Sequence, residues 1–336
     1  MVEQLPVSLV LATCDKREYL ALTLESLVAQ TQPAFQVVLC DDGTAGGVED
    51  VVAPFRDRLD LRLITQENRG RAAARNTALA HADGDLIVFL DDDRMAHPDF
   101  VAEHLAAAHD GGTGTIGWKR RALTWWRPGI LPLGETDLLR LVQRVGDVAR
   151  LAEPIRFLAP GDVTTDPLDA FTRTELGDEP DNYHAVIDEY GPGLADFRFG
   201  WALATTANLS VRRDAVKEVG GFDESFTGWG MEDTDLSYRL HHAGVTFSVR
   251  PTAVNYHQVH PLADPNLMLA QRAQRAQLLR NLDHFCRRHR ALDAYLFRRR
   301  WEYAMSLIEA DRLLKLVEGQ TSPLLRQELE ALYAAR

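Results

Sequence analysis

Apolar residues in the first 120 positions occur in short runs that alternate with longer amphipathic stretches. Four runs rich in β-branched side chains predict buried strands, at residues 7–12, 35–40, 61–64 and 85–90. Between them, residues 18–30 place Leu20, Leu24 and Leu27 on one helical face, and the alanine-rich residues 71–81 predict a second helix. Strands that alternate with helices predict an α/β fold, with a mostly parallel sheet covered by helices on both faces.

The pattern changes after residue 120. Residues 125–129 predict a loop, and the acidic residues 162–189 have few aliphatic side chains and no clear period, which predicts an irregular insertion. Regular patterning resumes at Phe199, and the sequence after Asn266 predicts helices. We therefore expect two halves of one domain and an extension: 1–120, 121–262 with the insertion at 120–195, and a helical C-terminal extension at 263–336.

Composition narrows the function classes. The chain has 336 residues and a formal net charge of -12, which argues against nucleic acid as a partner, because duplex binders need a basic face. The three cysteines, Cys14, Cys40 and Cys286, form no CxxC pair, so neither a zinc ribbon nor a disulfide framework is indicated. No run approaches about 18 apolar residues, and no N-terminal signal pattern is present. We expect a cytoplasmic protein without a transmembrane span; a homo-oligomer is compatible with the sequence.

Polar and acidic residues follow three of the predicted strands, at 13–15, 41–42 and 91–93. In open α/β sheets, ligands bind beyond the carboxyl ends of the strands. In an extended chain Asp91 and Asp93 would face one side and Asp92 the other. Two carboxylates at this spacing suit Mg²⁺ or Mn²⁺, which can neutralise a departing diphosphate as a Lewis acid. The alternative interpretation is a solvated acidic turn.

A tryptophan between two glycines precedes another predicted helix, in the segment 228–235. An indole offers a flat face on which a sugar ring can stack, and the glycines allow close approach. A nearby carboxylate could accept a proton as a general base, and the helix dipole would keep it ionised and lower its basicity. Compensation of the helix dipole alone is the alternative, and it suits Asp235 best.

Five segments in a fixed order resemble family 2 glycosyltransferases with the GT-A fold. They are 7–30 (VSLVLATCDKREYLALTLESLVAQ), 38–44 (VLCDDGT), 68–76 (NRGRAAARN), 90–93 (LDDD) and 208–240. The last segment also resembles the acceptor region of galactosyltransferases and polypeptide N-acetylgalactosaminyltransferases. The resemblance covers about residues 5–260. It implies a GT-A nucleotide-diphospho-sugar transferase fold, and transfer of a hexosyl group from a nucleotide-diphosphate sugar to a hydroxyl of a saccharide or small molecule.

The resemblance also implies roles for individual residues. The nucleotide would contact Thr13, Asp42, Arg75, Asp91 and Asp92. The metal, Mn²⁺ or Mg²⁺, would be bound by Asp91, Asp93 and His257, with His260 as the less favoured alternative to His257. Asp233 would be the general base, and the acceptor would be held by Trp229 and Glu232. Independently of the resemblance, the irregular pattern of residues 120–195 leads us to expect a flexible flap or an acceptor-binding insertion that shapes the choice of acceptor.

The chain departs from the family pattern after the first strand, where Pro-Thr-Tyr-Asn is replaced by Ala12-Thr13-Cys14-Asp15. The aromatic residue that often packs near the nucleobase is thus missing. A UDP-sugar is still the first expectation, because uracil is the commonest donor base in the family. Inversion is favoured, because Asp233 would lie opposite the leaving diphosphate; retention stays open.

Two other function classes remain open. A nucleotidyltransferase would need a glycine-rich loop with a lysine after the first strand, and residues 12–17 lack glycine. A non-catalytic nucleotide-sugar binder would be expected to lack the acids Asp91, Asp93 and Asp233, which are all present.

Two further patterns are weaker. Residues 112–117 fit GxGxxG but follow a helix and precede a strand, the reverse of a dinucleotide-binding context. Residues 271–301 contain nine arginines and two acids, which predicts a solvated helix face that pairs with the acidic remainder of the protein. Contact with anionic lipid or an anionic acceptor is the alternative.

Overall fold

The computed structural model describes residues 5–32, 34–128, 135–179, 184–260 and 267–319, and the short pieces 323–324 and 327–328. Of residues 267–271 and 303, the backbone alone is described. The expected boundary between the second half and the C-terminal extension, at 262–263, lies outside these residues, as do Asn266 and the end of the loop expected at 125–129.

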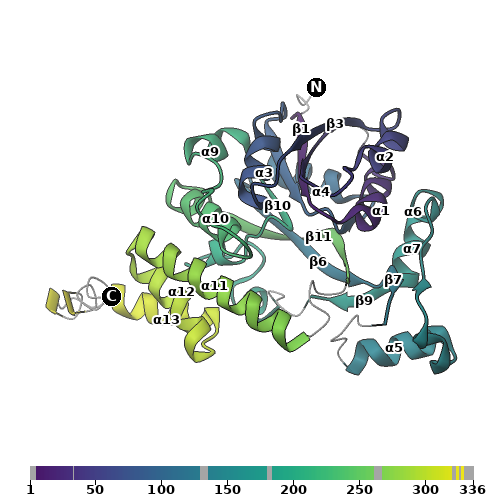
Figure 1. Cartoon of the computed structure of the whole chain (residues 1–336). Helices are drawn as coiled ribbons and strands as arrows, with labels where there is room; N and C mark the ends of the chain where they lie inside the picture. The colour runs from purple at the N-terminus through teal and green to yellow at the C-terminus, as the bar shows by residue number, and fades with distance from the viewer. Residues whose placement is uncertain are drawn as a thin grey trace.

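A nine-stranded sheet in the order β3-β2-β1-β4-β10-β6-β11-β5, with β9 beside β6, forms the centre of the molecule (Figure 1). Four parallel strands come from the runs predicted above: β1 (Val7–Thr13), β2 (Gln36–Asp42), β3 (Asp60–Gln66) and β4 (Leu86–Leu90). The helices predicted near them are α1 (Arg17–Val28) and α3 (Arg71–Leu79). The predicted α/β class and the parallel first half of the sheet are therefore confirmed.

The second half of the sheet mixes directions. Its strands are β5 (Arg94–Ala96), β6 (Gly114–Ala122), β9 (Glu175–Asp178), β10 (Asn208–Arg212) and β11 (Phe247–Gln258). Strand β10 lies antiparallel between β4 and β6, and β11 runs parallel to β6 and antiparallel to β5. In the last ladder His257 pairs with Arg94, which brings the end of β11 beside the acidic residues 91–93.

Side chains on β1 alternate between two apolar layers, as the period of a strand requires. Leu9 and Leu11 pack in one cluster with α1, α2 (Glu49–Val52) and α4 (Phe100–His109). Val10 packs in the other cluster, which includes side chains of α3. The sheet is thus covered on both faces, and its strand ends stay available for polar residues.

Three helices follow the sheet: α11 (Leu267–His289), α12 (Leu292–Tyr303) and α13 (Leu307–Glu318). They pack beside α10 (Glu232–His242), where the fully buried Trp201 contacts Tyr238, Phe285 and Phe297. Two short helices precede α10 in the sequence, α8 (His184–Tyr190) and α9 (Arg213–Glu218). None of the helices that the structure describes is long and apolar enough to cross a membrane.

The segment 120–195 is more regular than predicted. It contains α5 (Glu135–Val145), α6 (Asp162–Thr165) and α7 (Pro167–Thr174), and Trp125–Trp126 is not a loop but a short strand, β7, paired with β8 (Ile155–Arg156). The expectation of irregularity in 162–189 was wrong because each element is too short to display a period. Local caps define them instead: Asp166 accepts a hydrogen bond from the backbone of Asp169, and Pro167 begins α7.

Candidate active site

A cavity of about 450 Å³ lies beyond the carboxyl ends of β1, β2 and β4. Every residue predicted to contact the nucleotide lines it: Thr13, Asp42, Arg75, Asp91 and Asp92. Asp93 and Trp229 also line this first cavity, as does Lys16, which no sequence motif indicated. The strand ends that were predicted to meet at one edge of the sheet therefore do meet.

The acidic residues 91–93 do not form the extended segment that we expected. They lie in a turn between β4 and β5, so the three carboxylates point to different partners. Asp91 accepts from Arg75 at 3.0 Å and lies 3.6 Å from Arg94, while Asp92 accepts from the hydroxyl of Thr13 at 2.7 Å. The expectation that Asp91 and Asp93 face one side was therefore wrong, because the chain turns at this point.

Asp93 is the acid that meets the histidines. The ligand atoms of Asp93, His257 and His260 lie within 4.8 Å of one another, and Asp91 is not part of this group. Nε2 of His260 lies 3.1 Å from Oδ2 of Asp93, and Nε2 of His257 lies 3.7 Å from it. One carboxylate and two imidazoles form a mixed oxygen and nitrogen donor set, which fits a first-row divalent cation such as Mn²⁺ better than it fits Mg²⁺, because Mg²⁺ takes oxygen ligands. His260, the less favoured histidine in the sequence, thus lies nearer to Asp93 than His257 does.

The ammonium group of Lys16 also contacts Asp93, and it lies 3.2 Å from His260 and 3.8 Å from Asp92. Burial alone would raise the pKa of Asp93, but His257, His260 and Lys16 together hold that pKa well below its usual range. Positive charge therefore already stabilises this carboxylate. Lys16 lies in the short loop between β1 and α1, and its place after a strand that ends at the ligand edge was the one signal that could have found it.

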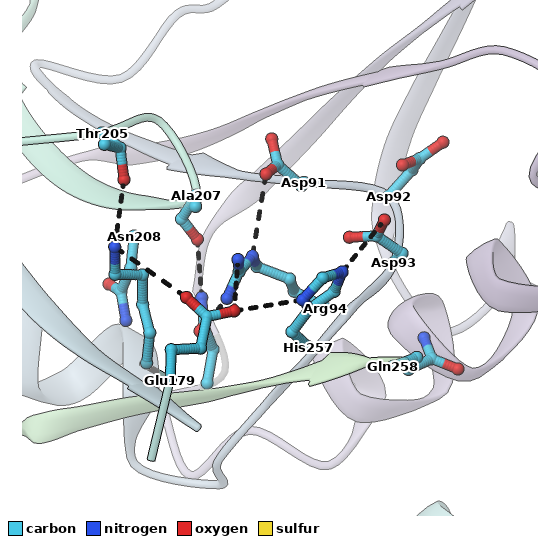
Figure 2. A network of polar contacts seen from close by, with 12 residues as sticks. Asp91, Asp92, Asp93, Arg94, Glu179, Thr205, Ala207, Asn208, His257 and Gln258 are labelled. Carbon is cyan, nitrogen blue, oxygen red and sulfur yellow. Dashed lines mark hydrogen bonds and ion pairs between the residues drawn. The ribbon is translucent and has the colours of Figure 1, made fainter. Parts of the chain in front are cut away.

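A buried ion network lies beneath the acidic turn (Figure 2). Glu179 accepts from Arg94 at 2.9 Å, contacts Nδ1 of His257 at 3.1 Å and lies 3.9 Å from Lys119. Burial would raise the pKa of Glu179, but Arg94, His257 and Lys119 hold it below its usual range. Glu179 was not predicted from the sequence because it lies in the segment without a readable pattern.

Asp42 organises the loop that borders the first cavity beside β2. Its two carboxylate oxygens accept hydrogen bonds from the backbone N–H groups of Arg69 and Gly70, at 2.9 and 2.8 Å, just before α3 begins. Gly43 is required here because a Cβ atom at this position would lie 2.8 Å from the backbone nitrogen of Asn68. The DDGT and NRG segments are therefore held together by one buried carboxylate.

A second cavity, of about 270 Å³, lies between the start of α10 and the C-terminal helices. Trp229 lines both cavities, and its side chain is 40% exposed. The backbone around it is left-handed at Gly228, Gly230 and Met231, with φ of 75°, 91° and 79°. The side-chain amide of Asn281 on α11 donates to the carbonyls of this loop at 2.8–3.3 Å. The indole is therefore presented by a shaped loop.

Asp233 lines the second cavity, in the first turn of α10. Burial and the neighbouring Glu232 raise the pKa of Asp233 to about 6. The expectation that the helix dipole lowers its basicity was therefore wrong, because desolvation and a like charge outweigh the dipole. A carboxylate of raised basicity is a better proton acceptor than one of the lowered basicity that we had expected.

The two other acids of this turn have their own partners. Glu232 borders the second cavity, yet its carboxylate pairs with Arg75 at 2.9 Å and links α10 to the first cavity. Asp235 is fully buried and pairs with Arg239 and His289, both at 2.7 Å, which ties α10 to α11. The function of Asp235 is therefore structural.

Comparisons with known proteins agree with this geometry. Residues 8–141 match the profile of glycosyl transferase family 2, and residues 194–261 match that of the N-terminal domain of galactosyltransferase. The glycosyltransferase YfnE of Bacillus subtilis is 32% identical over 263 residues, which cover 76% of this chain and 65% of YfnE. Validoxylamine A glucosyltransferase of Streptomyces hygroscopicus subsp. jinggangensis is 30% identical over 298 residues, which cover 87% of this chain and 63% of that protein.

Solved structures show the same fold. The mannosyltransferase PcManGT from Pyrobaculum calidifontis superposes with a TM-score of 0.55 at 18% identity, over 99% of this chain and 81% of that one. S. aureus TarS, residues 1–349, superposes with a TM-score of 0.51 at 16% identity, over 75% of this chain and 60% of that one. The chain spans less than two thirds of the length of the curated relatives named above. Its motifs, its matches and its GT-A fold identify residues 8–141 as a family 2 glycosyltransferase domain, in a chain whose curated relatives are glycosyltransferases.

Proposed function

We propose that the protein transfers a hexosyl group from a nucleotide-diphosphate sugar to a hydroxyl of a saccharide or small molecule, with inversion at the anomeric carbon. The observation that carries the proposal is the placement of Trp229 between two cavities. The first cavity contains the acids 91–93, and the second contains Asp233. A donor in the first cavity and an acceptor in the second would meet at the indole.

The side chains of the first cavity suit a nucleoside diphosphate. Arg75 and Lys16 offer positive charge to its phosphates, and Thr13 and Asp42 lie at the strand ends beside them. We expect Mn²⁺ or Mg²⁺ to be held by Asp93 with His257 and His260; when bound, it would neutralise negative charge on the diphosphate. Asp91 contacts the arginines Arg75 and Arg94, so in this proposal it orients the positive charge around the site.

Asp233 would act on the acceptor. Its pKa of about 6 leaves the carboxylate ionised near pH 7, and the backbone N–H of Thr234 holds one oxygen at 2.7 Å. Asp233 takes the proton from the acceptor hydroxyl while that oxygen forms a bond to the anomeric carbon. The bond from the anomeric carbon to the diphosphate oxygen breaks, and the diphosphate leaves with the bonding electrons. Attack from the side opposite the diphosphate inverts the configuration.

The relatives support a class of donor, the nucleotide-diphosphate sugars, rather than one particular donor sugar. They include a validoxylamine A glucosyltransferase and a hyaluronan synthase from Pasteurella multocida. Structures of the same fold contain GDP-Man with Mn²⁺, and UDP-GlcNAc. We propose a UDP-sugar first. The relative that covers 87% of this chain is named for a small-molecule acceptor, which favours a small acceptor over a growing polymer.

The experiment that tests this function is thermal unfolding with UDP-, GDP-, TDP- and CMP-sugars, each with and without Mn²⁺. A ligand that binds the native state alone, at about 100 times its Kd, stabilises it by about 2.7 kcal/mol. We expect the melting temperature to rise with one nucleotide class, and to require the metal. No rise with any nucleotide would contradict a donor site in the first cavity.

A further inference from the structure

Glu179 reaches the proposed metal site from a distant part of the sequence. It lies just after β9, in the segment 120–195, and is 8% exposed. Its Oε1 lies 3.1 Å from Nδ1 of His257, and Nε2 of the same ring lies 3.7 Å from Oδ2 of Asp93 (Figure 2). One imidazole thus bridges a buried carboxylate and the carboxylate that we expect to bind the cation.

We propose that Glu179 is the positioning residue for His257. Glu179 accepts a hydrogen bond from the N–H at Nδ1. The hydrogen therefore stays on Nδ1, and Nε2 keeps a lone pair on the side of the ring that faces Asp93. A neutral imidazole can offer a metal one nitrogen, and the hydrogen bond at the other nitrogen decides which one. This inference rests on the proposed function, because it concerns the cation expected at Asp93.

Two buried cations fix the carboxylate of Glu179 in this orientation. Arg94 donates to the same oxygen, Oε1, at 2.9 Å, and Lys119 lies 3.9 Å from the other oxygen. The exposed fractions of Arg94 and Lys119 are 6% and 2%, so rotation of the carboxylate would weaken two buried ion pairs. Arg94 also lies opposite His257 in the ladder of β5 and β11, so the backbone fixes the imidazole as well.

The insertion therefore acts on the donor side of the site. The irregular sequence pattern had led us to expect that the segment 120–195 shapes the choice of acceptor. Strand β9 joins the sheet through β6, with Asp178 opposite Arg120, and this pairing carries Glu179 under the acidic turn. A change in the insertion would thus alter metal binding even where it leaves the acceptor cavity untouched.

Two substitutions at Glu179 separate positioning from charge. Glu179→Leu removes the acceptor, and we expect Mn²⁺ affinity to fall about 10- to 100-fold. Glu179→Gln keeps an oxygen acceptor. Because Arg94 must donate to the oxygen, the amide would turn its oxygen rather than its nitrogen toward His257, and we expect the wild-type affinity to be retained within a few-fold. Glu175→Leu, at the start of β9, is the matched control, since Glu175 pairs with Arg120 and not with a histidine.

Mn²⁺ affinity is measured by calorimetry on the full chain, and melting temperatures verify that each variant folds. A second readout needs no metal: ¹⁵N NMR of the labelled protein, at a pH where the ring is neutral, with His257→Gln to identify the signals. We expect His257 of the wild type and of Glu179→Gln to carry its hydrogen on Nδ1. Glu179→Leu should shift hydrogen to Nε2.

The outcomes are distinguishable. An Nε2-protonated His257 in the wild type would overturn the inference, even if Glu179→Leu did not fold. Unchanged Mn²⁺ affinity in Glu179→Leu would overturn it as well. Failure of the wild type to bind Mn²⁺ would count against the proposed metal site, while the NMR measurement would still decide whether Glu179 sets the hydrogen position on His257.

Discussion

Asp233 is the side chain on which proton transfer depends in the proposed reaction. It lines the second cavity and not the first, so it should contribute to turnover without contributing to donor affinity. We expect Asp233→Asn to lower kcat by about 10²- to 10⁴-fold, the usual contribution of a general base. Initial rates and separate titrations with UDP and Mn²⁺ measure the two properties. Wild-type turnover in this variant would place the base elsewhere.

The raised pKa of Asp233 gives the reaction a defined pH dependence. The folded-state pKa of about 6 exceeds the ordinary value of 3.8, so the carboxylate gains its proton as pH falls through about 6. We expect kcat to be level above pH 7 and to decline below pH 6. The contribution of Asp233 to folding stability has the opposite pH dependence. It is fully present below the pKa of the unfolded state and is lost as the pH rises through about 6.

The predicted direction of this pH dependence of stability can be checked without measuring activity. Asp233→Asn removes the ionisable group, so its melting temperature relative to the wild type should be higher at pH 8 than at pH 4. Asp214→Asn, on the exposed surface of α9, is a control for the general effect of removing a negative charge. An equal difference at both pH values for Asp233→Asn would contradict the raised pKa.

Asp93 and Asp92 are neighbours that share Lys16 but otherwise have different partners, so they provide a matched pair. The carboxylate of Asp93 meets both histidines, whereas that of Asp92 accepts from Thr13. We expect Asp93→Asn to abolish the Mn²⁺ dependence of nucleotide binding, and Asp92→Asn to preserve it at reduced nucleotide affinity. Calorimetry with and without Mn²⁺ measures both, and a metal dependence that survived in Asp93→Asn would refute its assignment as a ligand.

At the scale of elements, the sequence predicted what local periodicity and strand ends encode. Residues 7–12 and 85–90 predicted β1 and β4 because buried parallel strands are short apolar runs. Asp91 was predicted to lie at the ligand edge because it directly follows the run at 85–90. Glu179 was not, because its position depends on the pairing of β9 with β6 across more than fifty residues of sequence. Contacts of that range leave no local pattern.

The loop that presents Trp229 depends on α11. Asn281 is 7% exposed, and its amide donates to the carbonyls of Thr227, Trp229 and Gly230. We expect Asn281→Ala to cost about 0.5–1.5 kcal/mol, the usual net contribution of a hydrogen bond, because the loop carbonyls lose their shared donor. Turnover should fall with it, since the left-handed backbone at Gly230 loses its support. Urea unfolding measures the first effect, and Arg280→Ala, at the neighbouring exposed position of the same helix, should change neither property.

At the scale of the whole molecule, the two expected halves share one sheet. Strand β10, from the second half, lies between β4 and β6, which both begin in the first half. Strand β5, from the first half, pairs with β11 of the second. The sheet therefore cannot be divided along the sequence without breaking ladders on both sides, and the division at residue 120 does not describe two independent folding units.

This interleaving predicts one cooperative unfolding transition for the sheet. Far-UV circular dichroism reports the sheet and helices, and fluorescence reports the six tryptophans, which include Trp118 on β6 and the buried Trp201 beside α10. The two signals should change together in urea, with the same midpoint and slope. Separate midpoints would mean that the segment around Trp201 and the C-terminal helices unfolds apart from the sheet. The first cavity, which the sheet carries, would then persist without the second cavity, and the proposed nucleotide binding would survive at denaturant concentrations that abolish turnover.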